Sequence, residues 1–188
     1  MTAEEFAAEK YDLPDSGRWV ELIAGRVVTL PPPDVGHGNI VLNFSKALAA
    51  HLQSLVDAEP GYACFELGLL VTRNPDTVRF PQISYYTEGD RFAQSEDIYS
   101  QDRPALVVEI TSTHDRRRGM PGRVREYHDW GIDTVWVADP IGQQVHLHRR
   151  GRPATRLDAT GTLSGDPILT GFRIGVADLF ADPEWWRS

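Results

Sequence analysis

The chain contains a single cysteine, Cys64, and two lysines, Lys10 and Lys46. One cysteine excludes an intrachain disulfide and a zinc site built from several cysteines. No apolar run is long enough to span a bilayer, and the longest helix-like stretch, residues 39–56, is amphipathic. Glycine-rich phosphate loops, GxSxG elbows and HExxH helices are also absent, so the enzyme classes that depend on them find no support. The opening MTAEEFAAEK is acidic and polar, unlike a signal peptide, so we expect a cytoplasmic protein that does not enter a membrane.

The charge is distributed unevenly along the chain. The net charge of −8 argues against a general nucleic-acid coat protein. Residues 116–156 nevertheless hold nine arginines and four acidic residues, a balance of +5, whereas the rest of the chain has a balance of −13. This asymmetry is consistent with a phosphate-facing patch on an acidic body. It is equally consistent with arginine being the preferred cation, because seventeen of the nineteen basic residues are arginine.

The length of 188 residues and the 41% hydrophobic content predict one domain over residues 1–188 with one good core. The pattern predicts a helix over 3–9, opened by the capping box Thr2-Ala-Glu-Glu5, and a long helix over 37–57. Strands are predicted over 19–23 and 26–30 as a hairpin, and over 61–72, 78–86, 105–110, 134–138 and 144–148. Pro121 fits the first turn of a further helix, and Gly131 fits its C-terminal cap.

The segment from Glu109 to Pro140 is the most informative of the chain. It reads as a buried strand ending in a carboxylate, a basic loop, a short helix and a second apolar strand, preceded upstream by RFPQ at 79–82. This arrangement resembles the catalytic half of the PD-(D/E)XK nuclease superfamily and, more narrowly, the Uma2 family (DUF820) of restriction-endonuclease-like proteins. The resemblance runs from the TAEEF start to the ADLF segment near the end. It implies an α/β (α+β) restriction-endonuclease-like fold, with a central mixed β-sheet flanked by helices and an N-terminal β-hairpin.

The resemblance also implies a site for Mg²⁺ or Mn²⁺, the cofactor of such nucleases. Glu21, in VELIAG, matches an early glutamate of the family, and Glu109, in LVVEITS, matches its central carboxylate. A charge inside an apolar strand is costly unless it is paired or metal-bound, which favours a functional Glu109 over a strand-end salt bridge. For Glu21 a plain hairpin glutamate is an equally good interpretation. By family analogy the backbone carbonyl of Ile110 is a further metal ligand.

Two positions depart from the family pattern. Gln82 stands where the family has aspartate, and Arg123 stands where it has a helical lysine. Glutamine can bind a metal through its amide oxygen but brings no charge, so we expect weaker Mg²⁺ binding. Arginine keeps the positive charge but cannot act as a base. The predicted catalytic residues are therefore Glu21, Gln82, Glu109 and Arg123, and the predicted metal ligands are Gln82, Glu109 and Ile110.

Other residues are weaker candidates for the site. His37, His114 and Asp115 could supply a ligand or activate a water, although a histidine in a loop is more often plain surface. Tyr127, in REYHDWGI, belongs to the matched motif and is a further candidate. The predicted nucleic-acid contacts are Arg116, Arg117, Arg118 and Arg125.

Two functional hypotheses follow from these residues. The first is a metal-dependent DNA endonuclease of the Uma2 type with a degenerate active site, weakly active or inactive. The second is a pseudonuclease that binds nucleic acid or a protein. A direct pair between Arg123 and Glu109 would favour the second hypothesis, and an octahedral ion there would exclude it. Because duplex cleavage on both strands favours twofold symmetry, we also expect a homodimer.

Overall fold

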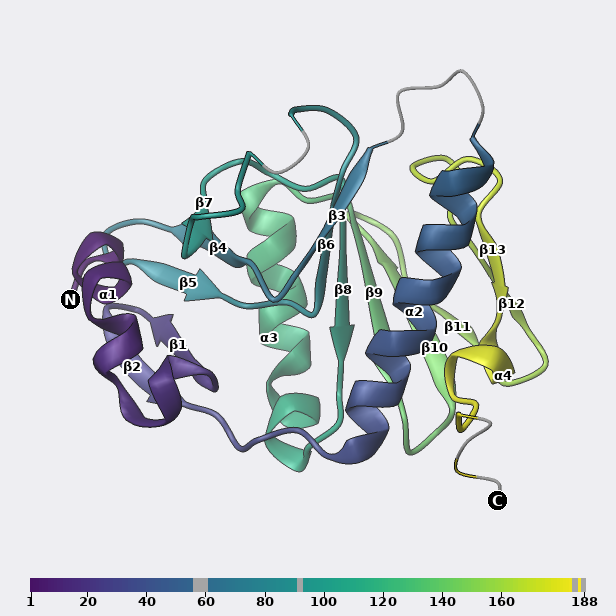
Figure 1. The fold of residues 1–188 in the computed structure, drawn as a ribbon, viewed down its shortest axis with the longest axis horizontal. Helices are drawn as coiled ribbons and strands as arrows, with labels where there is room; N and C mark the ends of the chain where they lie inside the picture. The colour runs from purple at the N-terminus through teal and green to yellow at the C-terminus, as the bar shows by residue number, and fades with distance from the viewer. Residues whose placement is uncertain (56–60, 91–92, 184–185, 187–188) are drawn as a thin grey trace.

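The computed structural model describes residues 1–55, 61–90, 93–183 and 186, arranged around two β-sheets (Figure 1). The helices are α1 (Ala3–Glu9), α2 (Val35–Ser54), α3 (His114–Trp130) and α4 (Val176–Leu179), with 3₁₀ turns η1 (Lys10–Asp12) and η2 (Pro14–Gly17). The strands of the first half are β1 (Val20–Ile23), β2 (Arg26–Thr29), β3 (Tyr62–Phe65), β4 (Gly68–Thr72), β5 (Thr77–Arg79), β6 (Ile83–Tyr86) and β7 (Tyr99–Ser100). Those of the second half are β8 (Leu106–Ile110), β9 (Thr134–Asp139), β10 (Gln144–Arg149), β11 (Thr155–Leu157), β12 (Thr162–Ser164) and β13 (Arg173–Gly175).

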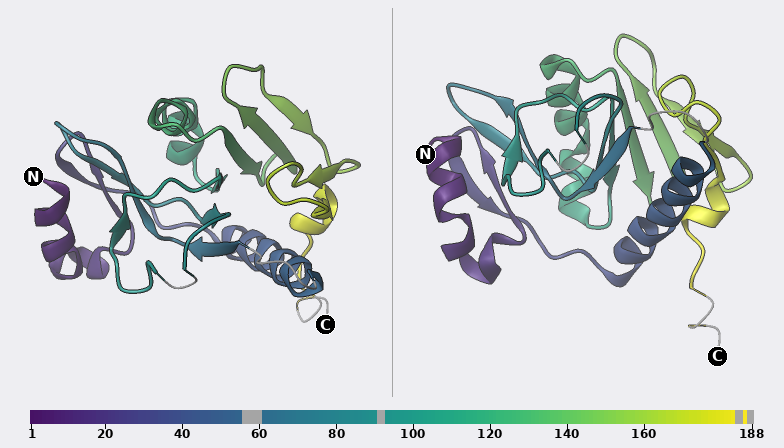
Figure 2. Two further views of the ribbon diagram at one scale, coloured as in Figure 1. Left: turned by 90° about the horizontal axis from the view of Figure 1, so that it is seen from above. Right: turned by 45° about the horizontal axis from the view of Figure 1, so that its top comes forward.

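The central sheet has six strands in the order β11-β10-β9-β8-β6-β3. Strands β8 and β9 are parallel and the other neighbours are antiparallel, so the sheet is mixed, as predicted. Helices α2 and α3 cover its opposite faces (Figure 2). Alternate residues of β8 and β9 therefore face different helices, which explains why both strands are apolar almost throughout.

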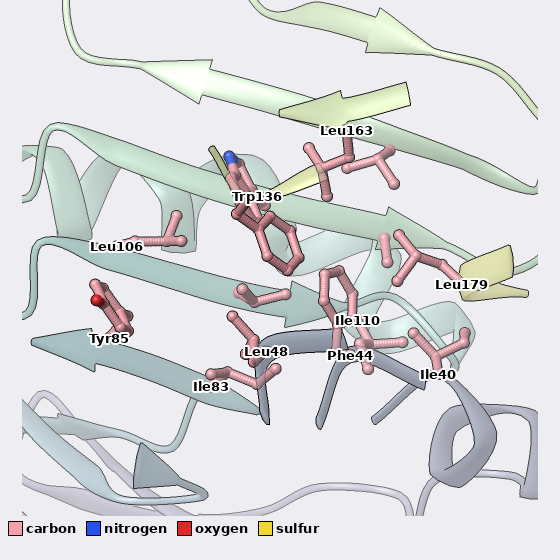
Figure 3. Packing of buried hydrophobic residues seen from close by; sticks show 14 of the residues in the cluster. Ile40, Phe44, Leu48, Ile83, Tyr85, Leu106, Ile110, Trp136, Leu163 and Leu179 are labelled. Carbon is pink, nitrogen blue, oxygen red and sulfur yellow. The ribbon is translucent and has the colours of Figure 1, made fainter. Parts of the chain in front are cut away.

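The face toward α2 holds the largest core. Phe44 of α2 stacks on Trp136 of β9, with ring centroids 6.5 Å apart, and Trp136 stacks on Phe172 at 6.1 Å. Aliphatic side chains surround these rings (Figure 3), among them Ile40, Leu48, Ile83, Leu106, Ile110, Leu163 and Leu179. The two-stranded β12-β13 ribbon and α4 thus close this side of the sheet.

The N-terminal half forms a second sheet of five strands, in the order β2-β1-β5-β4-β7. The predicted capping box is confirmed, because the Thr2 side chain accepts from the Glu5 N–H while the Glu5 carboxylate accepts from the Thr2 N–H. The predicted hairpin is also confirmed as β1 and β2. Strand β1 of this hairpin lies next to α3, on the side of the helix where the candidate active site described below is found.

The predicted strands over 61–72 and 78–86 are each divided in two, which corrects the sequence prediction. β3 and β6 belong to the central sheet, whereas β4 and β5 belong to the N-terminal sheet. The chain changes sheets at Glu66, which adopts a left-handed φ of 53°, and at Pro81, which has no N–H for a ladder. The apolar pattern continues across both breaks, so periodicity alone could not reveal them.

Helix α3 begins earlier than predicted. The Thr113 side chain accepts a hydrogen bond from the Arg116 N–H at 3.3 Å and caps the helix, so the expected basic loop is its first turn. Pro121 lies inside the helix on an exposed position rather than in the first turn, and Gly131 ends it in the left-handed conformation as predicted. Helix α2 likewise begins at Val35 instead of residue 37, because Asp34 caps the His37 N–H at 2.9 Å. Residues 56 and 57 of that prediction lie outside the described residues.

Among the residues that the structure describes, no helix is both long enough and apolar enough to cross a bilayer.

Candidate active site

The four predicted catalytic residues meet where the chain passes between the two sheets. Glu21 comes from β1, Gln82 directly precedes β6, Glu109 lies in β8 and Arg123 lies in α3. All four are buried, with Glu109 fully enclosed and Arg123 only 8% exposed. The register of the central sheet explains the position of Glu109, because it shares the α3-facing side of β8 with Val107. The fold therefore brings these residues together from segments far apart in sequence.

Arg123 lies between the two carboxylates. Its Nε donates to Glu109 Oε1 at 2.5 Å, and its two terminal nitrogens donate to the two oxygens of Glu21, with Nη1 to Oε2 at 2.8 Å. The contact with Glu21 is thus bidentate, the geometry in which a guanidinium binds a carboxylate best. A single side chain of α3 thereby joins β1 of one sheet to β8 of the other.

Arg79 extends this network, and the sequence prediction missed it. Its Nη1 donates to Glu21 Oε2 at 2.9 Å, and its Nε and Nη2 donate to both oxygens of Glu126 at 2.8 and 2.9 Å. The Phe80 N–H donates to Glu21 Oε1 at 3.1 Å. Arg79 stands in the RFPQ motif, and the available signal was a charge inside an otherwise apolar strand, the same signal that identified Glu109.

The charges of this network balance closely. Glu21 and Glu109 are matched by Arg79 and Arg123, and Glu126 adds one partly exposed negative charge. Burial alone would raise the pKa of Glu21, but the neighbouring Arg123 and Arg79 lower it to about 2. Burial opposes the charge of Arg123, yet Glu109 and Glu21 hold its pKa well above the ordinary value. Glu21 and Arg123 are therefore both ionised near neutral pH.

Gln82 connects the site to β8. Its Oε1 accepts a hydrogen bond from the Ile110 N–H at 2.9 Å. The predicted ligand oxygen of Gln82 thus already has a donor. That donor is the amide of Ile110, the residue whose backbone carbonyl was predicted to bind the metal. One oxygen of the site stays unpaired, since Glu109 Oε2 is buried without a hydrogen-bond partner among the described residues.

These residues do not fit a resident divalent cation. Mg²⁺ takes several oxygen ligands in near-octahedral geometry. Both oxygens of Glu21, Oε1 of Glu109 and Oε1 of Gln82 are engaged by N–H or O–H donors, which leaves Glu109 Oε2. In the described part of the chain, no group of three or more His, Cys, Asp or Glu side chains is placed to hold a metal. The Arg123 guanidinium takes the position between Glu21 and Glu109 that a cation would need.

Tyr127 belongs to the ion-pair network, and its contact with Glu109 leads to a testable prediction about stability. The Tyr127 hydroxyl donates to Glu109 Oε1 at 2.6 Å, and burial followed by Glu109 raises the tyrosine pKa well above its ordinary value. Tyr127→Phe should lower the free energy of unfolding by about 1.5–3 kcal/mol, because the buried carboxylate loses a donor. Chemical denaturation measures this, with Tyr11→Phe at a 68%-exposed ring as the control. Equal stability of Tyr127→Phe and wild type would show that Glu109 does not need this donor.

The other three weaker candidates, His37, His114 and Asp115, have no hydrogen bond or ion pair to the network among the described residues. His37 is buried, and its Nδ1 lies 3.1 Å from Ser112 Oγ. Burial and then Arg116 lower the pKa of His37 to about 4, so it is neutral near pH 7. His114 and Asp115 are exposed in the first turn of α3.

The four predicted nucleic-acid contacts occupy different sides of α3. Arg117 donates to the Thr111 carbonyl at 3.1 Å and lies 3.7 Å from Asp139. Arg118 and Arg125 are exposed, seven residues apart on one face of the helix. Arg116 is partly buried, and its Nε has no hydrogen-bond partner among the described residues. Of the four, only Arg116 lines the groove described next.

A groove of about 270 Å³ opens over Glu21 and Gln82. Three cationic residues line it: Lys10, Arg18 and Arg116. Its other lining residues are Tyr11, Asp15, Ser16, Trp19, Val20, Leu30, Glu66 and Phe80. The groove connects the ion-pair network to solvent between the η1–η2 segment and the start of α3.

Comparison with known proteins agrees with this architecture. A solved structure, that of a "putative nuclease belonging to DUF820" from Anabaena variabilis, superposes with a TM-score of 0.76 at 19% sequence identity, covering 96% of this chain and 97% of the other. That likeness shows the restriction-endonuclease-like fold with its mixed sheet, flanking helices and N-terminal hairpin. Among curated proteins, none matches the chain. The family model of Uma2, described as "Putative restriction endonuclease", matches residues 6–177, and the chain belongs to the Uma2 family.

Proposed function

We propose that this protein is a nuclease-like, nucleic-acid-binding member of the Uma2 family whose catalytic position is closed by an internal ion-pair network. One observation carries the proposal: Arg123 binds Glu21 in bidentate fashion and Glu109 through Nε. The two carboxylates among the predicted catalytic residues are therefore neutralised by a side chain of the protein itself. Of the two functional hypotheses, this geometry favours the pseudonuclease.

The chemistry of the substituted residues supports the same conclusion. Phosphodiester hydrolysis requires an activated water and stabilisation of charge on the transferring phosphorus. Gln82 supplies no negative charge, and Arg123 cannot accept a proton from water. With Glu21 and Glu109 engaged in ion pairs, no free carboxylate pair is left to assemble that machinery.

The groove supports binding of nucleic acid rather than of an arbitrary partner. Lys10, Arg18 and Arg116 place positive charge beside the closed site in a protein whose net charge is −8. Arginine and lysine are the usual partners of phosphate oxygens. We infer that DNA is bound here, and a protein partner becomes the alternative if no nucleic acid binds.

A cleavage assay tests the proposal. Plasmid and single-stranded DNA are incubated with Mg²⁺ or Mn²⁺ and one of four proteins: wild type, Glu109→Ala, Gln82→Asp/Arg123→Lys, or that double variant carrying Glu109→Ala. We expect no cleavage by wild type, cleavage by the double variant, and its loss when Glu109 is removed. Folding of each variant is checked by thermal denaturation under the same conditions. Wild-type cleavage that disappears in Glu109→Ala would contradict the proposal.

That contrary result would support the second candidate function, a Mg²⁺- or Mn²⁺-dependent endonuclease with a rearranged site. One observation favours it, because Glu109 Oε2 is buried and unpaired, and a buried carboxylate oxygen without a donor is costly. Arg123 would have to leave the carboxylates in that case. A homodimer remains a prediction tied to this candidate, and gel filtration coupled to light scattering measures it.

A further inference from the structure

We infer that the groove over Glu21 and Gln82 selects an unpaired polynucleotide strand over a duplex. This inference rests on the proposed function and specifies its ligand. The groove has a volume of about 270 Å³, just below the usual range for sites that enclose small molecules. In a duplex each base is held in its pair and stack, so it can enter such a groove only after it is extruded.

Two aromatic side chains, Tyr11 and Trp19, line the groove. Tyr11 is 68% exposed on η1, and Trp19 is partly buried just before β1. A single exposed tyrosine is ordinary, but two aromatic residues beside a cationic groove form a potential stacking platform. Every base has a flat face that can stack, so this feature favours unpaired bases whatever their sequence.

The cations are placed for a few phosphates rather than a long row. Lys10 Nζ lies 4.6 Å from the centroid of the Phe80 ring and donates to the Gly17 carbonyl, so its position is fixed. Gly17 must lack a side chain here, because a Cβ would lie 2.2 Å from the Lys10 carbonyl oxygen. Arg116 adds a guanidinium whose buried Nε is unpaired among the described residues. Lys10, Arg116 and Arg18 together contribute the positive charge of the residues that line the groove.

The residues around the groove do not extend its positive charge into a surface long enough to contact a duplex. Asp15 and Glu66 also line the groove and offset part of its positive charge. Arg118 and Arg125 lie on a different face of α3 from Arg123, as the exposure of the first two and the burial of the third show. Duplex binders use many phosphate contacts along one surface. The groove is therefore better matched to a short unpaired segment.

Fluorescence anisotropy tests the inference. A 5′-labelled 12-nucleotide DNA of mixed sequence is titrated as a single strand and as a duplex, in EDTA so that cleavage is prevented. An RNA of the same sequence distinguishes a deoxyribose from a ribose preference. We expect the single strand to bind at least about tenfold more tightly than the duplex, with a shallow salt dependence that corresponds to a few phosphates.

Substitutions test whether the groove causes the preference for a single strand over a duplex. Tyr11→Ala should weaken single-strand binding about tenfold, and Arg116→Gln should weaken it and reduce the salt slope. Arg152→Gln, at an exposed position that does not line the groove, is the control and should leave the affinity unchanged. Equal affinity for duplex and single strand, or unchanged binding by Tyr11→Ala, would overturn this inference alone. Failure of every oligonucleotide to bind would overturn the proposed function as well.

Discussion

Replacing Arg123 by methionine is expected to destabilise the protein by about 3–5 kcal/mol at pH 7. The substitution keeps a long side chain but leaves Glu21 and Glu109 buried without the guanidinium between them. Arg79 can then neutralise only Glu21, and Tyr127 offers Glu109 a neutral donor. An uncompensated buried carboxylate is costly, which is the physical reason for the expected loss of stability.

Chemical denaturation of Arg123→Met and wild type measures this difference. Arg125→Met is the matched control, because Arg125 lies on the exposed side of the same helix and its loss should change stability by no more than about 0.5 kcal/mol. Equal stability of Arg123→Met and wild type would show that the ion pairs do not stabilise the fold.

The same variant tests whether Arg123 stands in for a cation. Once the guanidinium is removed, Mn²⁺ should raise the melting temperature of Arg123→Met, because it binds the freed carboxylates of the folded state. Wild type should not respond, since three of the four carboxylate oxygens of Glu21 and Glu109 are already engaged by donors. A rise in wild type as large as that in the variant would show that metal displaces Arg123, which is the behaviour of the rearranged nuclease.

The sequence predicted the centre of this site better than its surroundings. Glu109 was identifiable because a charge within the apolar run ALVVEI demands a partner, and the spacing from Glu109 to Tyr127 located Arg123 on the following helix. What the sequence could not provide was the partner itself. A carboxylate that binds a metal and one that binds a guanidinium have the same strand pattern.

Two parts of the prediction were wrong or incomplete, for different physical reasons. Arg79 contacts Glu126 at the point where the chain leaves the N-terminal sheet after β5. The apolar pattern of 78–86 continues across this change of sheet and therefore does not reveal it. The beginning of α3 was misplaced because a proline usually marks a first turn, whereas here Thr113 caps the helix about two turns before Pro121. A tertiary contact therefore decided the first case, and a local helix cap decided the second.

Glu21→Gln is expected to destabilise the protein by about 3–5 kcal/mol at pH 7, for the opposite electrostatic reason. The amide keeps the shape of the side chain and can still accept from the Phe80 N–H. It removes the negative charge shared by Arg79 and Arg123, and its NH₂ group would place a donor against guanidinium donors. Two buried cations then have only Glu109 and Glu126 as ionic partners.

The pH dependence gives this prediction a distinctive signature. The pKa of Glu21 is lowered from an ordinary value of 4.5 to about 2 in the folded protein, so the unfolded chain binds more protons between these values. Stability from this group is therefore complete above about pH 4.5 and is lost as the pH falls toward 2, amounting to roughly 3 kcal/mol. His37, whose pKa is lowered from 6.5 to about 4, destabilises both proteins over a higher pH window and does not contribute to their difference.

Denaturant unfolding of wild type and Glu21→Gln at pH 7, 5, 4 and 3 measures the difference in their free energies of unfolding. This difference should be large at pH 7 and should decrease below pH 4.5. Glu88→Gln, at an exposed position, is the control and should follow wild type throughout. If Glu21→Gln kept the full acid dependence of wild type, other carboxylates would dominate the acid transition. A difference that disappears at low pH instead means that the charge on Glu21 stabilises the fold by binding both guanidinium groups. The carboxylate of Glu21 is then engaged by Arg79 and Arg123 rather than by a metal.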